Sequence, residues 1–186
     1  MTRIYESDVE ELAISLLESV GYTYLPPEDQ ERERNDLADV VLKNRLVAAV
    51  EKLNPHLPAE AKEQAVKDVL NLGSLALVEN NEAFHKMLTE GIDVEVYANG
   101  EIKGSKVWLV DFDMPSNNEF LVSNQFTVTH ENTTKRPDIV LLVNGLPLVV
   151  IELKNPTDEQ ATVKKAFTQL QNYKNAIPQL FHYNGI

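Results

Sequence analysis

The sequence has 186 residues, 43% hydrophobic and 25% charged, which suits one sizeable globular domain, and it contains no apolar run long enough to cross a membrane. The absence of cysteine excludes disulfides, thiolate nucleophiles and cysteine-bound zinc, and it fits a reducing, cytoplasmic location. The net charge of −12 argues against a protein that mainly holds nucleic acid, because Lys and Arg supply most DNA affinity, so we expect weak DNA binding from this chain alone.

The first predicted element is a helix near the N-terminus. Ser7 and Glu10 have the spacing of a capping box, in which side chains bond the free backbone N–H groups of the first turn. Apolar residues then recur at the spacing of one helical face, at Val9, Leu12, Ala13, Leu16, Leu17 and Val20. Gly21 stands where a helix is usually capped, and residues 22–25 form a candidate short strand.

The next region, residues 28–90, is predicted to be a helical insertion. Leu, Val and Ala repeat at helical spacing in three stretches, and proline or glycine separates one stretch from the next. These stretches cover residues 37–53, 59–70 and 75–90. The region carries no chemical motif, so we expect it to pack around a core without taking part in chemistry.

The periodicity changes after Gly91 to short runs rich in β-branched and aromatic residues, which predict strands. The runs cover residues 94–98, 106–112 and 120–129, with turn signals at 99–100 and 115–118. Residues 138–143 and 148–154 are almost continuously apolar, so we predict two central strands covered on both faces.

The last predicted elements are a helix and a final strand. Thr157 and Gln160 have capping-box spacing and open a helix through Ala176, with Phe167, Leu170 and Tyr173 on one side. Residues 181–186 resemble a strand cut short, so we expect the chain to be the N-terminal part of something longer. The element order predicts a mixed α/β fold with a three- to five-stranded sheet flanked by helices.

Three charged residues border or interrupt the most apolar stretch: Asp138, Glu152 and Lys154. Glu152 and Lys154 are two residues apart, so their side chains leave the same face of a strand. Two carboxylates and a substrate phosphate can hold Mg²⁺, and we predict that Asp138 and Glu152 do so, with the carbonyl of Leu153 as a further candidate ligand. Lys154 would then orient a metal-bound water and stabilise charge during hydrolysis of a phosphodiester bond.

The turn between these two strands decides whether Asp138 and Glu152 can share one metal ion. A plain two-residue turn at Asn144 and Gly145 would pair Asp138 with Ile151, and the two carboxylates would point to opposite faces of the sheet. We therefore predict a three-residue loop with Gly145 left-handed, or a β-bulge, because either one restores a common face. A regular hairpin would count against the metal site.

The helix after the charged residues adds two further candidates, Gln169 and Tyr173, which lie four apart on one helical face. An Asp, Glu and Lys in this pattern are a weak signal alone, since a local ion pair at a strand end explains them as well. An amide and a phenol that can reach a metal site or a DNA phosphate favour a nuclease, although a surface amide and a core-edge tyrosine are common. Lys135 and Arg136 are candidate phosphate contacts, and solvated basic residues beside a strand are also common.

These residues carry a family resemblance. Pro137-Asp138 with Glu152-Leu-Lys154 resembles the PD-(D/E)xK nuclease motif, and residues 169–173 resemble the Q-x-x-x-Y motif of RecB-like nucleases. The sequence is still more similar to the N-terminal nuclease domain of the restriction subunit of type I restriction-modification enzymes. That likeness lies in residues 6–10, 21–22, 124–128 and 136–156, and it does not cover the helical region.

The resemblance implies a PD-(D/E)xK restriction-endonuclease-like fold, with residues 1–186 as one nuclease domain and 91–178 as its sheet and catalytic core. It implies a Mg²⁺-dependent endonuclease that cuts unmodified foreign double-stranded DNA beside methylation and specificity subunits. ATP-driven translocation would come from motor domains elsewhere, because the chain has no Gly-x-x-x-x-Gly-Lys-Ser/Thr loop. A glutamate of the first helix would approach the metal, with Glu10 the choice and Glu6 the alternative, although capping explains Glu10 equally well.

Two other functions are compatible with the sequence. One is a non-catalytic docking module that links a motor to partner subunits, and the other is a stand-alone repair or recombination nuclease. The intact set of Asp138, Glu152 and Lys154 favours the restriction nuclease over the module, because a scaffold has no need for buried charges. The acidic charge and the ending of the chain speak against the stand-alone enzyme.

Overall fold

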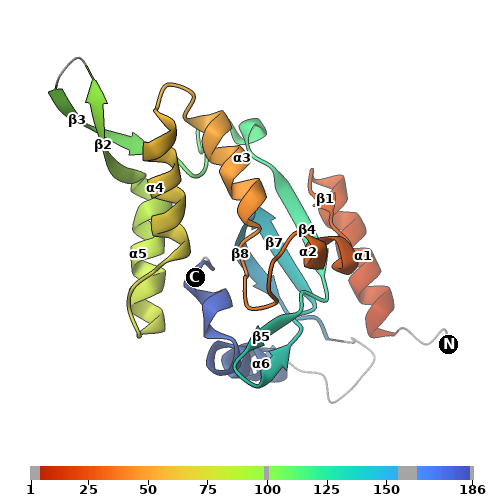
Figure 1. The fold of residues 1–186 in the computed structure, drawn as a ribbon. Helices are drawn as coiled ribbons and strands as arrows, with labels where there is room; N and C mark the ends of the chain where they lie inside the picture. The colour runs from red at the N-terminus through yellow and green to blue at the C-terminus, as the bar shows by residue number, and fades with distance from the viewer. Residues whose placement is uncertain (1–4, 99–100, 155–162, 185–186) are drawn as a thin grey trace.

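A mixed four-stranded β-sheet lies at the centre of the computed structural model, which describes residues 5–98, 101–154 and 163–184 (Figure 1). The strand order is β1-β4-β7-β8. β1 (Thr23–Tyr24) runs parallel to β4 (Phe120–Asn124), whereas β7 (Ile139–Val143) pairs antiparallel with both β4 and β8 (Leu146–Ile151). This arrangement confirms the predicted mixed α/β class and the predicted number of strands.

Helices lie on both sides of the sheet (Figure 1). They are α1 (Glu6–Ser19), α2 (Pro27–Arg32), α3 (Lys43–Leu53), α4 (Ala59–Leu70), α5 (Leu77–Glu90) and α6 (Val163–Ala176), with short 3₁₀ helices η1 (Pro115–Asn117) and η2 (Pro178–His182). Two hairpins stand apart from the sheet: β2 (Ile92–Ala98) with β3 (Glu101–Val107), and β5 (Val128–His130) with β6 (Thr133–Lys135). In the part of the chain described, no helix is long and apolar enough to span a bilayer.

The alternation of β7 divides the interior into two cores. Ile139 and Leu141 face a small cluster that includes Ile14 and Leu17 of α1. Val140 and Leu142 face a larger cluster formed with the helical region and the end of the chain. Every residue of β7 is buried, as expected for a strand covered on both faces.

β8 differs from this expectation because it is an edge strand of the described sheet. Only its first two residues are buried, and Val149 is 41% exposed. The prediction of two central strands is therefore confirmed for β7 and wrong for β8. A continuous apolar run does not by itself distinguish a central strand from an edge strand that is half covered.

The first helix matches its predicted extent, but its capping differs. Asp8 accepts the backbone N–H of Tyr5 at 2.7 Å, so the capping box predicted for Ser7 and Glu10 is wrong. At the other end Gly21 has φ +103° and closes the helix through backbone bonds to the preceding turn. Glu10 is thereby available for contacts outside its own helix.

In the helical region, α4 spans the predicted residues 59–70, whereas only the second half of the predicted helix 37–53 is helical. Asp36 organises a turn by accepting the N–H of Ala38 at 2.7 Å, and residues 40–42 then run as a buried, non-helical connection. The short α2 was not expected. Tertiary burial, rather than helical periodicity, explains the apolar residues of this connection.

Of the strands predicted in the middle region, 94–98 is confirmed within β2, and the other two differ from the structure. The strand expected at 106–112 ends at Val107, because Asp111 then folds a loop by accepting the N–H groups of Asp113 and Met114 at 3.1 and 2.8 Å. The strand expected at 120–129 is broken at Gln125, whose φ is +50°. The predicted turn at 99–100 lies outside the described residues.

The C-terminal predictions have mixed outcomes. Within α6, Tyr173 is 6% exposed but Phe167 is 60% exposed, so the three apolar residues do not form one buried side. Residues 181–182 belong to η2 rather than to a strand. The capping box predicted at 157–160 lies outside the described residues.

The hairpin of β7 and β8 has a two-residue turn and a β-bulge. Val143 pairs directly with Leu146, and Asn144 and Gly145 both have positive φ, +53° and +82°. Leu142 pairs with Pro147 but Leu141 pairs with Val149, so Leu148 is an extra residue. The three-residue loop is therefore wrong and the bulge is confirmed. The last pair is Ile139 with Ile151, and the same register continued by one residue would set Asp138 opposite Glu152.

The turn of this hairpin packs tightly against the start of α3. The carbonyl of Gly145 accepts the N–H of Leu42 at 2.9 Å. A Cβ added to Gly145 would lie 2.5 Å from the carbonyl oxygen of Leu42 and 3.1 Å from the backbone nitrogen of Leu46. The turn therefore needs glycine both for its backbone conformation and for this close approach.

Gly145→Ala is expected to lower the free energy of unfolding by about 2 kcal/mol or more, because strain at positive φ and the backbone clash act together. Urea unfolding measures the change. Gly104→Ala is the matched control, since no atom lies within 4 Å of its added Cβ. Equal stability of the two variants would contradict the tight packing of the turn.

Candidate active site

The bulge brings the three predicted charged residues to one end of the β7–β8 hairpin. Nζ of Lys154 donates to Oε1 of Glu152 at 2.7 Å and to the carbonyl oxygen of Leu153 at 2.9 Å. Oδ2 of Asp138 accepts the backbone N–H of Leu153 at 2.8 Å. The two carboxylates and the ammonium group therefore form one compact cluster, held by the backbone that follows β8.

Glu152 is the most constrained member of the cluster. Its side chain is 1% exposed, and its second oxygen, Oε2, is buried without a hydrogen-bond partner among the described residues. Burial raises the pKa of Glu152, the hydrogen bond from Lys154 opposes that rise, and the charge of Asp138 adds to it. A buried carboxylate oxygen without a donor is costly, so this atom is suited to a cation.

Tyr173 and Gln169 are brought to the same cluster by α6. Nε2 of Gln169 donates to the phenol oxygen of Tyr173 at 2.8 Å, and Tyr173 is 6% exposed. The pKa of Tyr173 is raised, first by burial and also by the negative charges of Glu152 and Asp138, while the bond from Gln169 acts in the opposite direction. The predicted pair on one helical face thus lies beside the carboxylates.

Glu10 approaches this end of the sheet through two amides. Its carboxylate accepts Nδ2 of Asn124 and Nε2 of Gln125, each at 2.6 Å, and the N–H of Gln125 donates to the carbonyl of Asp138 at 2.9 Å. Within the described ranges no three acidic or histidine side chains gather as a metal-binding group. Glu10 therefore lies next to the segment that carries Asp138, and its approach to a metal ion stays a prediction, while the alternative, Glu6, is exposed.

Asn124 and Gln125 are site residues to which the sequence assigned no role. They lie within the strand predicted at 120–129 and more than a hundred positions from Glu10, so only the folded sheet brings them together with Glu10. Asn124 also accepts the phenol O–H of Tyr24 at 2.8 Å. The family resemblance includes residues 124–128, but it assigns no role to Asn124 or Gln125.

Basic and polar side chains line a hollow on the side of α6 that carries Gln169 and Tyr173. We call it the α6 hollow; its lining residues are Lys135, Lys164, Lys165, Thr168, Gln169, Asn172 and Tyr173. Lys135 is thus placed as a candidate phosphate contact, whereas Arg136 is exposed and does not line the hollow. Lys164 and Lys165 were not predicted, because lysines in a helix usually indicate only a solvated face.

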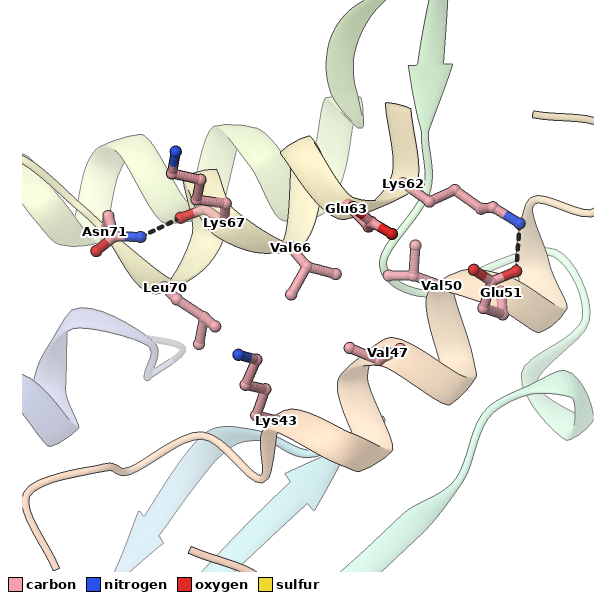
Figure 2. A pocket seen from close by; sticks show the side chains of 10 residues that line it. All are labelled: Lys43, Val47, Val50, Glu51, Lys62, Glu63, Val66, Lys67, Leu70 and Asn71. Atoms are coloured by element: carbon pink, nitrogen blue, oxygen red, sulfur yellow. Dashed lines mark hydrogen bonds and ion pairs between the residues drawn. The ribbon is translucent and has the colours of Figure 1, made fainter. Parts of the chain in front are cut away.

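A second hollow lies between α3 and α4 (Figure 2). Val47, Val50, Val66 and Leu70 line it together with polar residues, and Lys62 forms an ion pair with Glu51 at its end. None of its lining residues is a predicted site residue, so this groove is separate from the cluster at the end of β8.

The donor set of the cluster fits a hard divalent cation. Asp138 and Glu152 supply carboxylate oxygens, one of them buried and unpartnered, and Leu153 supplies a carbonyl oxygen. Mg²⁺ prefers oxygen ligands and usually keeps several waters, so two carboxylates suffice. The ammonium group of Lys154 now contacts two of these oxygens, which shows that a positive charge is well placed there.

Comparison with known proteins gives consistent matches. Residues 3–186 match the family model described as the type I restriction enzyme R protein N terminus. The chain is 43% identical over 185 residues to the type I restriction enzyme HindI endonuclease subunit of Haemophilus influenzae and 39% identical over 186 residues to the putative MjaIXP endonuclease subunit of Methanocaldococcus jannaschii. Each alignment covers 96% of this chain and 18% of the relative. The EcoprrI endonuclease subunit of Escherichia coli is 31% identical over 96% of this chain and 53% of its own length.

Glu152→Gln is expected to change how stability depends on pH. Because the folded chain raises the pKa of Glu152, this group favours folding most at pH values below its ordinary pKa, and that contribution is lost as pH rises through the raised value. The free energy of unfolding of the variant should therefore rise relative to the unsubstituted chain as the pH increases from about 4, near the ordinary pKa of a glutamate. Urea unfolding across this range measures it. Glu82→Gln, on the exposed side of α5, is the control, and its free energy of unfolding should differ from that of the unsubstituted chain by the same amount at each pH. The same constant difference for Glu152→Gln would contradict the effect of burial on this carboxyl group.

Proposed function

We propose, because the chain belongs to the family of type I restriction enzyme R protein N-termini, that it is the DNA-cleaving domain of a restriction enzyme. The observation that carries the proposal is the buried carboxylate of Glu152, with one unpartnered oxygen, beside Asp138 and Lys154. A chain that served only as a docking module would gain nothing from this costly arrangement. The likeness to endonuclease subunits in the relatives' names supports the same function.

In this proposal Asp138 and Glu152 hold Mg²⁺, with the carbonyl of Leu153 as a further ligand. When bound, Mg²⁺ lowers the pKa of a coordinated water and offsets negative charge on a phosphate. Glu10 is the residue of α1 that would approach the metal, and it also keeps Gln125 in place beside Asp138 and so positions the backbone that carries the first carboxylate.

Lys154 acts on the attacking water and on the phosphate. Its ammonium group can donate to a water oxygen beside the carboxylates and can stabilise the charge that builds on the phosphate in the transition state. Tyr173, oriented by Gln169, supplies a phenol O–H for a phosphate oxygen, while Lys135 and Arg136 attract the DNA backbone. The reaction is hydrolysis of a phosphodiester bond in double-stranded DNA.

The remaining parts of restriction belong, in this proposal, to other segments and subunits. The chain spans 18% of the length of the HindI and MjaIXP relatives and has no Gly-x-x-x-x-Gly-Lys-Ser/Thr loop. ATP-driven translocation would come from motor domains, and recognition of unmodified foreign DNA from methylation and specificity subunits. Residues 1–186 then form one nuclease domain of the PD-(D/E)xK type, with 28–90 as its helical insertion.

Mg²⁺ binding tests the carboxylate pair. Asp138→Asn and Glu152→Gln are each expected to abolish binding measured by calorimetry, because each removes a charged ligand while keeping the size of the side chain. Asp113→Asn, which changes an exposed carboxylate outside the cluster, should bind as the unsubstituted chain does. Titrations are repeated with a short DNA duplex present. If the two cluster variants bind Mg²⁺ as tightly as the control in both conditions, the metal site is wrong.

Lys154→Met is expected to retain Mg²⁺ binding but to slow DNA cleavage about a hundredfold or more, because a group that stabilises transition-state charge is lost. The measurement is the rate at which the restriction complex containing the variant chain nicks supercoiled plasmid DNA. Lys67→Met is the matched control, since Lys67 lies in the groove between α3 and α4 (Figure 2). Unchanged cleavage by Lys154→Met would rule out its proposed role.

A further inference from the structure

We propose that the α6 hollow binds the sugar-phosphate backbone of the DNA beside the cleavage point, with Lys164 and Lys165 as phosphate-binding residues next to Lys135. This inference rests on the proposed function and deepens it, because it names a binding surface and two residues that the cleavage chemistry does not require.

The lining of the hollow has a charge opposite to that of the whole chain. Among the described residues its lining includes three lysines and no acidic side chain, although the chain carries 29 acidic and 17 basic residues. A local positive surface in a protein with net charge −12 is suited to a polyanion, since a phosphate backbone gains affinity from each lysine that neutralises it.

Two segments far apart in the sequence build this surface. Lys135 ends β6, three residues before Asp138, whereas Lys164 and Lys165 belong to the first turn of α6 as described. The α6 residues of the hollow recur with helical spacing, at Lys164, Lys165, Thr168, Gln169, Asn172 and Tyr173. They therefore form one stripe along the helix, with lysines at one end and the phenol at the other.

The stripe leads to the carboxylate cluster. Tyr173 lines the hollow together with Lys135, which stands three residues before Asp138, so the hollow borders the segment that carries the first carboxylate. From Lys164 to Tyr173 the stripe extends about 13 Å along the helix, on the order of four base pairs of duplex DNA. A strand lying along α6 would thus have one phosphate at the cluster and others at the lysines.

The chemistry of the lining favours the backbone of DNA over its bases. Lysine ammonium groups are flexible point charges, and hydroxyl and amide groups complete a surface for phosphate and sugar oxygens. Nothing in this set requires a particular base edge. We therefore expect the hollow to bind duplexes of different sequence with similar affinity, which suits a cutting domain that leaves recognition to other subunits.

The test is fluorescence anisotropy with a labelled DNA duplex and the full chain at low salt, in EDTA so that no metal contributes. The Lys164→Ala and Lys165→Ala double variant should bind about tenfold more weakly, and the slope of log K against log salt should fall by about 1 to 2. A Lys86→Ala and Lys103→Ala double variant, with two exposed lysines on α5 and β3 changed, removes the same charge and should keep affinity and slope. A Lys164→Arg and Lys165→Arg variant should restore binding.

Two results would overturn the inference: equal affinity and slope for the two alanine variants, or no binding of the duplex by the unsubstituted chain at low salt. Calorimetry with Mg²⁺ separates this outcome from failure of the nuclease proposal. If Asp138→Asn loses Mg²⁺ binding and the lysine substitutions leave DNA binding unchanged, only the proposed DNA binding by the α6 hollow is refuted. If the lysine substitutions weaken DNA binding but the unsubstituted chain binds no Mg²⁺, only the proposed nuclease function is refuted.

Discussion

The position of one extra residue in β8 determines which side of the sheet carries the chemistry. Side chains alternate along a strand, so a two-residue turn without further irregularity would send Asp138 and Glu152 to opposite faces. Leu148 shifts the register by one and places the two carboxylates together, while the backbone N–H of Leu153 binds Asp138. The carboxylate cluster beside Tyr173 therefore depends on this shift.

The chain separates its charges by function. Most acidic residues are on the surface, but Glu152 is buried beside Asp138. The ammonium group of Lys154 offsets only part of the free-energy cost of burying this carboxylate. Lysines that would be unremarkable elsewhere gather along α6 and at the end of β6. An acidic protein can thus present a small positive surface next to a pair of carboxylates that need a cation, and these two features complement each other around a phosphate.

The sequence predicted those parts of the site that depend on spacing along the chain. The pair Glu152 and Lys154 follows from strand alternation, Gln169 and Tyr173 from helical spacing, and the bulge from the need for a common face. Contacts between distant segments could not be predicted in this way. For Glu10, helix capping and an approach to the metal stayed equally open, because its partners, Asn124 and Gln125, come near only when α1 packs on β4. The buried connection at 40–42 was interpreted as helix for the same reason, since apolar periodicity does not report what covers a segment.

The irregularity that aligns the carboxylates also affects the outer side of β8. An edge strand presents free N–H and C=O groups, which invite another chain to extend the sheet. Here Pro147 has no N–H to offer, its carbonyl accepts Nδ2 of Asn184 at 2.7 Å, and the extra residue Leu148 breaks the regular ladder. The strand that carries Glu152 is therefore a poor template for a further strand, and the same residue that shapes the site helps to protect the protein from edge-to-edge aggregation.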